Sequence, residues 1–345
     1  MSKISFYDTK PYDQIYFDKL KGDYNCEIDY HEAKLDRTTA VLSKGADCVC
    51  AFVNDTLDKE TLEELYQLGI RLIVMRCAGY NNIDFRYAFE KIHVLRVPAY
   101  SPYAVAEATM GMLLMLNRKL HKAYIRTRDF NFSLNGLVGF DIHGKTIGVI
   151  GTGKIGRTFI DVCSGFGANM LMYDPYPAKD TNYNYVSLDE LFEKSDVISL
   201  HCPLSKESFH MINEESIAKM KEGVFILNTS RGALIDSEAL LKGLKSGKIG
   251  AAGLDVYEEE SDLFFEDYSD KIIQDDVLAR LVTLPNVLVT SHQAFLTEEA
   301  LKNIATTTLQ NVQAFFNNEK LENEVCYHCS KEFTNCQHRL NRPCF

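Results

Sequence analysis

The chain has 345 residues, a length that accommodates two domains of ordinary size. Hydrophobic residues make up 46% of it and charged residues 25%, proportions typical of a chain that folds around a sizeable core, so general disorder is excluded. The formal net charge of -11 argues against partners such as nucleic acid or anionic membrane, because those surfaces attract basic proteins.

The start of the chain and its cysteines indicate where the protein works. Asp8 interrupts the region in which an export signal needs an apolar run. The uncharged apolar stretch Ala108–Asn117 has about half of the roughly 20 residues that a membrane span needs. Six of the ten cysteines stand singly or in strand-like contexts, unlike a dense disulfide framework. We therefore expect a soluble, cytoplasmic protein without a membrane segment.

Short β-rich runs alternate with helical patterns through most of the chain, which predicts an α/β fold with parallel sheets. The first hundred residues contain a predicted helix, Lys59–Leu68, and four predicted strands: Ile4–Tyr7, Cys48–Val53, Leu72–Arg76 and Val94–Val97. After Pro98 and Pro102, the stretch Ala104–Arg118 is rich in Ala, Met and Leu, which predicts a buried helix.

A second series has the rhythm of a doubly wound dinucleotide fold. Its six predicted strands are Thr146–Ile150, Asn169–Tyr173, Val197–Leu200, Val224–Asn228, Ala251–Asp255 and Val287–Thr290, and its predicted helices are Lys154–Phe166, Glu214–Met220 and Ser237–Ser246. A last helical pattern, Glu298–Asn317, would return to the first domain. The predicted domains are therefore 1–101 plus 297–330 for the substrate, 102–296 for the nucleotide, and a tail at 331–345.

A glycine fingerprint, Gly151-Thr-Gly153-Lys-Ile-Gly156, follows the first strand of this second series and opens a helix. In that context, glycines allow a tight turn and let backbone N–H groups approach a pyrophosphate at the helix N-terminus. Asp174 stands at the end of the next strand, where a carboxylate accepts hydrogen bonds from ribose hydroxyls and repels a 2′-phosphate. The sequence therefore predicts NAD, in preference to NADP, as the cofactor.

Three ionisable side chains follow the later strands, and ligands bind at the carboxyl ends of strands in such sheets. They are Arg231 in Asn228-Thr-Ser-Arg231-Gly, an acid of the run Asp255-Val-Tyr-Glu-Glu-Glu260, and His292. A guanidinium matches a carboxylate, an imidazole exchanges a proton near neutral pH, and a carboxylate beside the imidazole fixes its tautomer. Together they suit hydride transfer to a 2-oxo acid.

These segments, with Arg76-Cys-Ala-Gly-Tyr-Asn-Asn, Val97-Pro-Ala-Tyr-Ser-Pro and His201-Cys-Pro, resemble the D-isomer-specific 2-hydroxyacid dehydrogenases, and among them the fermentative D-lactate dehydrogenases. The resemblance runs from about residue 1 to residue 326. It implies two Rossmann-like doubly wound domains, with the nucleotide-binding domain inserted in a discontinuous substrate domain. It also implies that Arg231 binds the substrate carboxylate, that His292 donates a proton, and that Glu260 pairs with His292. The implied reaction is the reversible reduction of pyruvate to D-lactate.

The resemblance implies further contacts on both sides of the reaction. The implied cofactor-binding residues are Gly151, Gly153, Lys154, Ile155, Gly156, Asp174, Cys202, Pro203, Thr229, Ser230 and Asp255, with Asp255 near the nicotinamide. The implied substrate-binding residues are Phe52, Ala78, Gly79, Tyr100 and Phe295, of which Ala78 and Gly79 would act through backbone N–H groups. Bulky rings at three of these positions favour a small substrate such as pyruvate.

Several residues are expected to lie outside the chemistry. Glu258 and Glu259 are interpreted as a solvated loop, and His31, His93, His121, His143 and His210 as surface or core histidines without a paired carboxylate. His201 lacks an evident partner and is interpreted as a neighbour of the site. The tail carries Cys326, Cys329, Cys336 and His338, a set that suggests either a zinc knuckle or, as we expect, a disordered end without metal.

Alternatives remain open at this point. The same chemistry could serve a larger 2-oxo acid, and relatives of the fold include NADH-sensing corepressors that bind protein partners. The apolar segments Ala104–Arg118 and Arg128–Phe140 predict a homodimer or a dimer of dimers, since one chain would not bury both.

Overall fold

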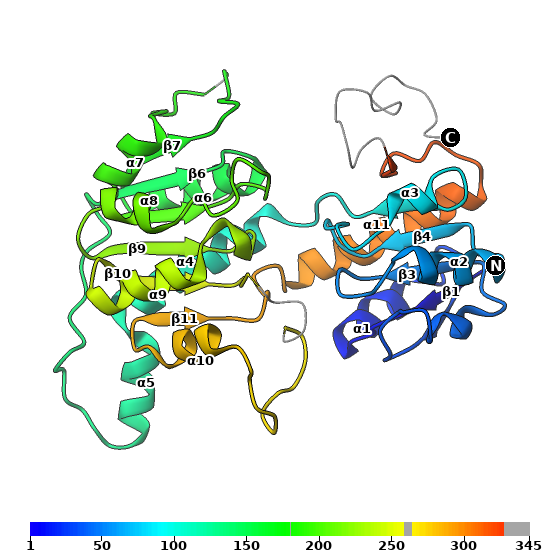
Figure 1. The fold of residues 1–345 in the computed structure, drawn as a ribbon, viewed down its shortest axis with the longest axis horizontal. Helices are drawn as coiled ribbons and strands as arrows, with labels where there is room; N and C mark the ends of the chain where they lie inside the picture. Colours follow the sequence, from blue (N-terminus) through cyan, green and yellow to red (C-terminus); the bar gives the residue numbers. More distant parts are fainter. Residues whose placement is uncertain (180, 259–263, 328–345) are drawn as a thin grey trace. The chain divides into compact units, whose positions relative to one another are not determined.

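Two parallel β-sheets organise the chain (Figure 1). The computed structural model describes residues 1–179, 181–258 and 264–327. Unit 1 comprises Met1–Ser101 and the chain from Thr297 onward, and unit 2 comprises Pro102–Leu296. The prediction of an α/β fold with two doubly wound sheets is confirmed.

Unit 1 has a five-stranded sheet in the order β2-β1-β3-β4-β5, and each neighbouring pair is parallel. The strands are β1 (Ser2–Phe6), β2 (Cys26–Tyr30), β3 (Cys48–Ala51), β4 (Leu72–Met75) and β5 (His93–Arg96). The helices are α1 (Pro11–Leu20), α2 (Lys59–Gln67), α3 (Phe85–Ala88) and α11 (Glu298–Phe316), with a 3₁₀ turn at Ala40–Ser43. The strand order reverses between β1 and β3, and open sheets of this kind bind ligands at such a switch point.

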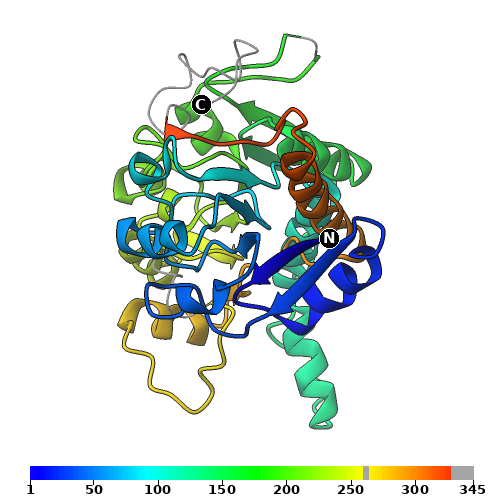
Figure 2. The same cartoon turned by 90° about the vertical axis from the view of Figure 1, so that its right-hand side faces the viewer.

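The core of unit 1 depends on a helix from the far end of the chain. Ala305, Leu309 and Val312 of α11 pack in one cluster with Phe6 of β1 and Val74 of β4. Figure 2 shows α11 lying along one face of this sheet. Because these side chains are fully buried, the hydrophobic effect holds α11 on a sheet that was built from the first hundred residues.

Unit 2 has a six-stranded parallel sheet in the order β11-β10-β9-β8-β6-β7. The strands are β6 (Thr146–Ile150), β7 (Asn169–Tyr173), β8 (Val197–Leu200), β9 (Val224–Asn228), β10 (Ile249–Leu254) and β11 (Val287–Val289). The helices are α4 (Pro102–Arg118), α5 (Leu120–Arg128), α6 (Lys154–Gly165), α7 (Leu188–Lys194), α8 (Glu214–Lys219), α9 (Ser237–Ser246) and α10 (Asp276–Thr283), with a 3₁₀ turn at Gly232–Leu234. A parallel bridge from Met172 to Tyr185 continues the sheet beyond β7.

Helix α4 belongs to the core of unit 2, as predicted for Ala104–Arg118. Met110, Leu113 and Leu116 pack in one cluster with Val149 of β6 and Phe159 of α6. The expectation that one chain would not bury both apolar segments is therefore wrong for Ala104–Arg118, because nine residues of this helix are buried within the single chain. Within the part of the chain that the structure describes, none of the helices is long and apolar enough to cross a membrane.

Candidate active site

The turn between β6 and α6 depends on two glycines. Gly151 has a φ of +94°, and its N–H donates a 2.8 Å hydrogen bond to the carbonyl oxygen of Tyr173. A Cβ at Gly151 would meet the carbonyl of His201, and a Cβ at Gly156 would overlap the Gly151 carbonyl oxygen. Both positions therefore need glycine. The resulting turn leaves the N-terminus of α6, which begins at Lys154, close to any anion bound there.

Asp174 is fixed against this turn. Its Oδ2 accepts hydrogen bonds from the Thr152 N–H at 2.7 Å and from Thr152 Oγ1 at 3.0 Å, and its Oδ1 accepts one from the Tyr176 N–H at 2.8 Å. The carboxylate therefore has a set position at the end of β7, beside the glycine turn. A charge held there can select between a ribose hydroxyl and a ribose phosphate.

Gly153, Lys154 and Ile155 lie at the start of α6. Gly153 is the N-cap residue and has an extended backbone, while Lys154 and Ile155 are the first two residues of the helix. Gly153 and Lys154 are exposed, and Ile155 is half-buried. This is the arrangement in which backbone N–H groups at a helix end point toward an anion.

The segments after β8 and β9 are tied together. Ser230 Oγ donates a 2.6 Å hydrogen bond to the carbonyl oxygen of Cys202, which is followed by the exposed Pro203. The hydroxyl groups of Thr229 and Thr109 lie 2.8 Å apart, so Thr229 joins the β9 end to α4. Burial raises the pKa of the Cys202 thiol to about 11, so the thiol stays protonated near neutral pH. The side chains of Thr229 and Ser230 thus hold the loops in place.

Arg231 precedes the 3₁₀ turn that follows β9. Its carbonyl oxygen accepts a 2.8 Å hydrogen bond from Asn228 Nδ2, and its guanidinium donates one of 2.7 Å to the Ser230 carbonyl oxygen. A Cβ at the next residue, Gly232, would overlap the Tyr257 carbonyl. The Arg231 turn is thus packed directly on the chain that follows β10.

Asp255, directly after β10, organises the loop that carries His292. Its Oδ1 accepts hydrogen bonds from Thr290 Oγ1 at 2.6 Å and from the Gln293 N–H at 2.8 Å, while its Oδ2 accepts one from the Ala294 N–H at 2.8 Å. The side chain is buried, and burial raises the pKa of its carboxyl group. Sequence reasoning placed Asp255 near the nicotinamide and missed this structural role, because the loop lies over thirty residues further along the chain.

His292 has an uncommon backbone conformation in this loop. Its φ is +52°, and its N–H donates a 2.7 Å hydrogen bond to the Asp255 carbonyl oxygen. The imidazole is half-buried beside Phe265, with ring centroids 5.9 Å apart. Positive φ at a non-glycine residue is a strain that the surrounding contacts must maintain. Glu260, the expected partner of His292, lies outside the described residues.

Four of the expected substrate residues lie at strand ends in unit 1. Phe52 follows β3, and its N–H donates a 2.6 Å hydrogen bond to Asp55 Oδ2. The Ala78 carbonyl oxygen accepts a 2.7 Å bond from Arg96, the Gly79 carbonyl one of 3.3 Å from the Cys77 thiol, and the Tyr100 carbonyl one of 2.7 Å from Asn303. The fifth residue, Phe295, is half-buried in unit 2, close in sequence to His292.

A buried ionic cluster that sequence reasoning missed supports the Phe52 turn. The Arg76 guanidinium carbon lies 4.6 Å from the ring centroids of both Phe52 and Phe6, and Arg76 Nε is 3.5 Å from Asp13 Oδ2. Burial raises the pKa of Asp13 and raises that of Asp55 to about 6. The cluster was not predicted because its members lie far apart in the sequence: Asp13 in α1, Asp55 after β3 and Arg76 after β4. The sequence signal was limited to Asp8 and Asp55, the acids that follow the apolar strands β1 and β3.

Two histidines have carboxylate partners, which corrects the sequence-based expectation. His210 Nε2 lies 2.5 Å from Glu258 Oε1, and His93 Nδ1 lies 2.6 Å from Glu324 Oε1. Glu258 is therefore not a solvated loop residue. Each pair joins positions far apart in the sequence, which spacing alone does not reveal.

His201 also has a partner, although it has no carboxylate. Its Nε2 lies 2.8 Å from Ser199 Oγ, and its ring packs at 5.0 Å from Phe159. Burial lowers the pKa of this histidine to about 3, so it is neutral at physiological pH. It therefore supports the glycine turn without carrying a charge. The expected zinc knuckle or disordered tail beyond residue 327 lies outside the described residues.

Comparison with known proteins places this geometry in a family. "D-lactate dehydrogenase" from Escherichia coli is 51% identical over 327 residues, which cover 94% of this chain and 99% of that protein. "2-hydroxyacid dehydrogenase homolog" from Haemophilus influenzae has the same identity and the same coverage of both chains. The solved apo-structure of D-lactate dehydrogenase from Escherichia coli matches with a TM-score of 0.86 at 47% identity, covering 94% of this chain and 99% of that one.

The cofactor follows from the same comparison and from the structure of unit 2. Residues 110–294 match the family described as "D-isomer specific 2-hydroxyacid dehydrogenase, NAD binding domain". The glycine turn, which a Cβ would fill at two positions, and the fixed carboxylate of Asp174 fit a dinucleotide. NAD is therefore the cofactor, and the resemblance seen in the motifs is confirmed. The chain belongs to the D-isomer specific 2-hydroxyacid dehydrogenases.

Proposed function

We propose that this chain is an NAD-dependent D-lactate dehydrogenase that reversibly reduces pyruvate to D-lactate. The observation that carries the proposal is the set of contacts that hold together the three chain segments after β9, β10 and β11. Gly232 packs the Arg231 turn on Tyr257, while Asp255 holds the loop that contains His292. These contacts, which all involve the chain after β10, support the assignment of Arg231 as the carboxylate-binding cation and of His292 as the proton donor. The similarity to proteins named D-lactate dehydrogenase gives independent support.

In the proposed reaction, each catalytic residue has one task. Arg231 binds the pyruvate carboxylate and polarises the keto oxygen. His292 gives its proton to that oxygen, and Glu260 pairs with the imidazole and fixes its tautomer. NADH supplies the hydride that reaches the keto carbon, so one hydride and one proton convert the 2-oxo acid into the 2-hydroxy acid.

The remaining site residues are assigned on the family resemblance and on their positions. The proposed catalytic residues are Arg231, Glu260 and His292. The proposed substrate-binding residues are Phe52, Ala78, Gly79, Tyr100 and Phe295. The proposed cofactor-binding residues are Gly151, Gly153, Lys154, Ile155, Gly156, Asp174, Cys202, Pro203, Thr229, Ser230 and Asp255. The rigid anchoring of the Phe52 turn by Asp55 supports a fixed, small pocket wall in unit 1.

The decisive experiment follows NADH consumption by the purified full chain with pyruvate and with 2-oxoisocaproate, and then determines the chirality of the product. We expect faster turnover of pyruvate and formation of D-lactate only. A higher kcat/KM for 2-oxoisocaproate would assign a larger substrate. NADH binding without turnover of any 2-oxo acid would favour a corepressor-like binding protein, and L-lactate would contradict the proposed stereochemistry.

Replacing Asp174 with alanine should relax the discrimination against NADPH. We expect the ratio of kcat/KM for NADPH over NADH to rise at least about tenfold, equivalent to about 1.4 kcal/mol, because the variant no longer repels the 2′-phosphate. Asp174→Asn is the matched control for fold, since its amide oxygen can still accept the hydrogen bond from Thr152. Equal efficiency of the unmodified protein with both cofactors would contradict the assignment.

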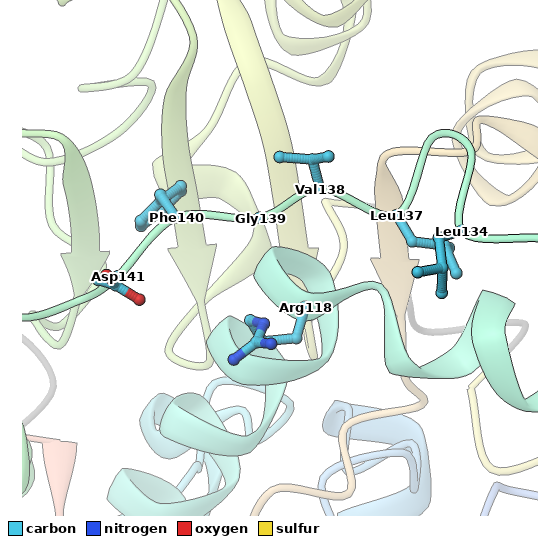
Figure 3. Close-up of a pocket in the computed structure, with 7 residues that line it drawn as sticks. All are labelled: Arg118, Leu134, Leu137, Val138, Gly139, Phe140 and Asp141. Carbon is cyan, nitrogen blue, oxygen red and sulfur yellow. The ribbon is translucent and has the colours of Figure 1, made fainter.

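We also propose a homodimer or a dimer of dimers. Helix α5 has no buried residues, and the segment after it exposes 85% of Phe130, 79% of Leu134 and 82% of Val138. Figure 3 shows Leu134, Leu137 and Val138 along a pocket of about 300 Å³ that Arg118 and Phe140 also line. Contiguous exposed apolar side chains of this size favour association with another protein surface.

The oligomer has a direct test in sedimentation equilibrium. We expect a mass of two or four times the 39.2 kDa of one chain, because a second copy would cover the apolar side chains after α5. Leu134→Asp with Val138→Asp should shift the protein toward the monomer. A single species of 39.2 kDa for the unmodified chain would contradict the proposal.

A cytoplasmic location is proposed on the basis of the thiols. Cys26, Cys48, Cys50, Cys163 and Cys202 are free thiols, and the first four of them are buried. Disulfides accumulate in exported proteins, whereas reducing compartments keep thiols free.

A further inference from the structure

The pair formed by His210 and Glu258 lies beside the proposed catalytic residues and has no task in the reaction described above. Glu258 Oε1 is 2.5 Å from His210 Nε2, and Glu258 Oε2 accepts hydrogen bonds from Ser237 Oγ at 3.1 Å and from the Ser237 N–H at 3.4 Å. Ser237 is the first residue of α9, a helix of ten residues, so the carboxylate also faces the positive end of a helix dipole. The carboxylate thus lies where three segments meet: the loop before α8, the turn that runs from Arg231 to the start of α9, and the chain after β10.

The first segment is the loop before α8. His210 has a φ of +49°, and its N–H donates a 2.9 Å hydrogen bond to the Ala233 carbonyl oxygen. Two further hydrogen bonds connect the same segments. The Ile212 N–H donates to the Leu234 carbonyl oxygen at 3.0 Å, and the Asp236 N–H donates to the Ile212 carbonyl oxygen at 2.9 Å. This loop therefore runs alongside the turn that begins with Arg231.

The second and third segments are the Arg231 turn itself and the chain after β10. Gly232 approaches the Tyr257 carbonyl and the Glu258 nitrogen so closely that a Cβ would overlap them. Glu258 precedes Glu260 by two positions, and Asp255 precedes Glu258 by three. The chain is thus anchored at Asp255 and again at Glu258 before it reaches the proposed partner of His292.

We infer that Glu258, held by His210 and Ser237, is a positioning residue that fixes the chain after β10 against the Arg231 turn. Glu258 acts through these neighbours and does not touch the substrate. The inference rests on the proposed function, because it concerns the placement of residues that the proposal makes catalytic. The inference assigns a role to the contact between Glu258 and His210, which takes no part in the proposed chemical steps.

The location of the pair determines which kinetic constant should respond. Glu258 follows β10, whereas Asp174 follows β7, which lies at the opposite edge of the sheet order. Loss of Glu258 should therefore leave the preference for NADH over NADPH, which is assigned to Asp174, unchanged. It should lower kcat, because misplacing a catalytic group by about 1 Å can cost roughly 100-fold in rate.

The experiment compares Glu258→Ala, Glu258→Gln and His210→Ala with the unmodified chain, in pyruvate reduction and in binding of NADH and NADPH. We expect Glu258→Ala to lower kcat by about 10- to 100-fold with an unchanged ratio of the Kd values for NADPH and NADH. Glu258→Gln keeps the shape and one of the two acceptor oxygens and should recover part of the loss. The double variant His210→Ala with Glu258→Ala should be no slower than Glu258→Ala alone, because the two residues act as one unit.

The chain offers a matched control in its second histidine–carboxylate pair. Glu324→Ala breaks the 2.6 Å contact with His93 in unit 1, and Glu324 is more deeply buried than Glu258. This variant should lower the thermal midpoint without lowering kcat. An equal fall in kcat for Glu324→Ala, or an unchanged kcat in folded Glu258→Ala, would overturn the inference.

The two proposals fail in different ways. An unmodified chain that turns over no 2-oxo acid overturns the proposed function and this inference together. An active unmodified chain whose Glu258→Ala variant is folded and equally fast overturns the inference alone. If Glu258→Ala does not fold, Glu258→Gln and His210→Ala decide, and normal kcat in both would contradict the positioning role.

Discussion

Replacing His292 with alanine is expected to lower kcat for pyruvate reduction by about 10²- to 10⁴-fold, the range for loss of a general acid. The keto oxygen would then have to take its proton from water while the hydride arrives. Binding of NADH should be unchanged, since the glycine turn and Asp174 lie after different strands. Stopped-flow measurement of NADH oxidation in single turnover would separate this chemical step from product release.

The backbone at His292 calls for a second variant. A φ of +52° is more costly for alanine than for asparagine, which tolerates the left-handed region well. His292→Asn should therefore keep the loop that Asp255 holds, while lacking the imidazole that donates the proton. If folded His292→Asn loses no more than about threefold in kcat, the decrease is far smaller than the one expected for loss of a general acid. That result would exclude His292 from the role of proton donor.

Replacing Arg231 with alanine is expected to lower kcat/KM for pyruvate by roughly 10²- to 10³-fold, about 2.7–4.1 kcal/mol, which lies within the 2–5 kcal/mol lost when one partner of a buried charge pair is removed. Both constants should change, because the guanidinium binds the carboxylate and also polarises the keto oxygen. Arg231→Lys keeps the charge but not the planar fork, so we expect it to restore only part of the activity.

The control for Arg231 lies in the same unit. Arg280 of α10 is exposed, and Arg280→Ala removes one positive charge without touching the segments after β9 to β11. Its kinetic constants should equal those of the unmodified chain. A normal KM for pyruvate in Arg231→Ala would contradict the assignment of the carboxylate contact, even if kcat fell.

The sheet of unit 2 could be predicted closely from sequence because its strands are apolar on both faces. Four of its six strands were predicted to the residue, since runs such as Val197–Leu200 end abruptly in polar residues or glycine. β2 of unit 1 was missed for the opposite reason. It is an edge strand with Glu27 and Asp29 facing solvent, and acidic residues are unfavourable in strands.

The missed helices share a weak apolar pattern or a short length. α1 begins with a proline and mixes charged residues with tyrosine, and α5 buries none of its residues. Periodicity cannot identify such helices, because it reports only the contrast between a buried and an exposed face. α7 and α10 have seven and eight residues, fewer than the window in which a helical period becomes evident.

The candidate site shows the same division between local and long-range information. Arg231, Asp174 and His292 could be predicted because each follows a strand, and strand ends meet at one edge of the sheet. The partners of Asp255 and Glu258 could not be predicted, since Ala294 and His210 lie 39 and 48 positions away along the chain. Sequence spacing carries no signal for contacts that only the folded loops create.

The placement of α11 has a consequence for synthesis of the protein. The strands of unit 1 lie within Met1–Ser101, but the side chains of Ala305, Leu309 and Val312 that cover one face of its sheet follow the whole of Pro102–Leu296. At roughly 5–20 residues per second, a ribosome needs about 10–40 s to make the intervening segment. During that interval the nascent sheet has an uncovered apolar face, whereas unit 2 is contiguous and can fold first. Chaperone demand during translation should therefore fall on the N-terminal hundred residues.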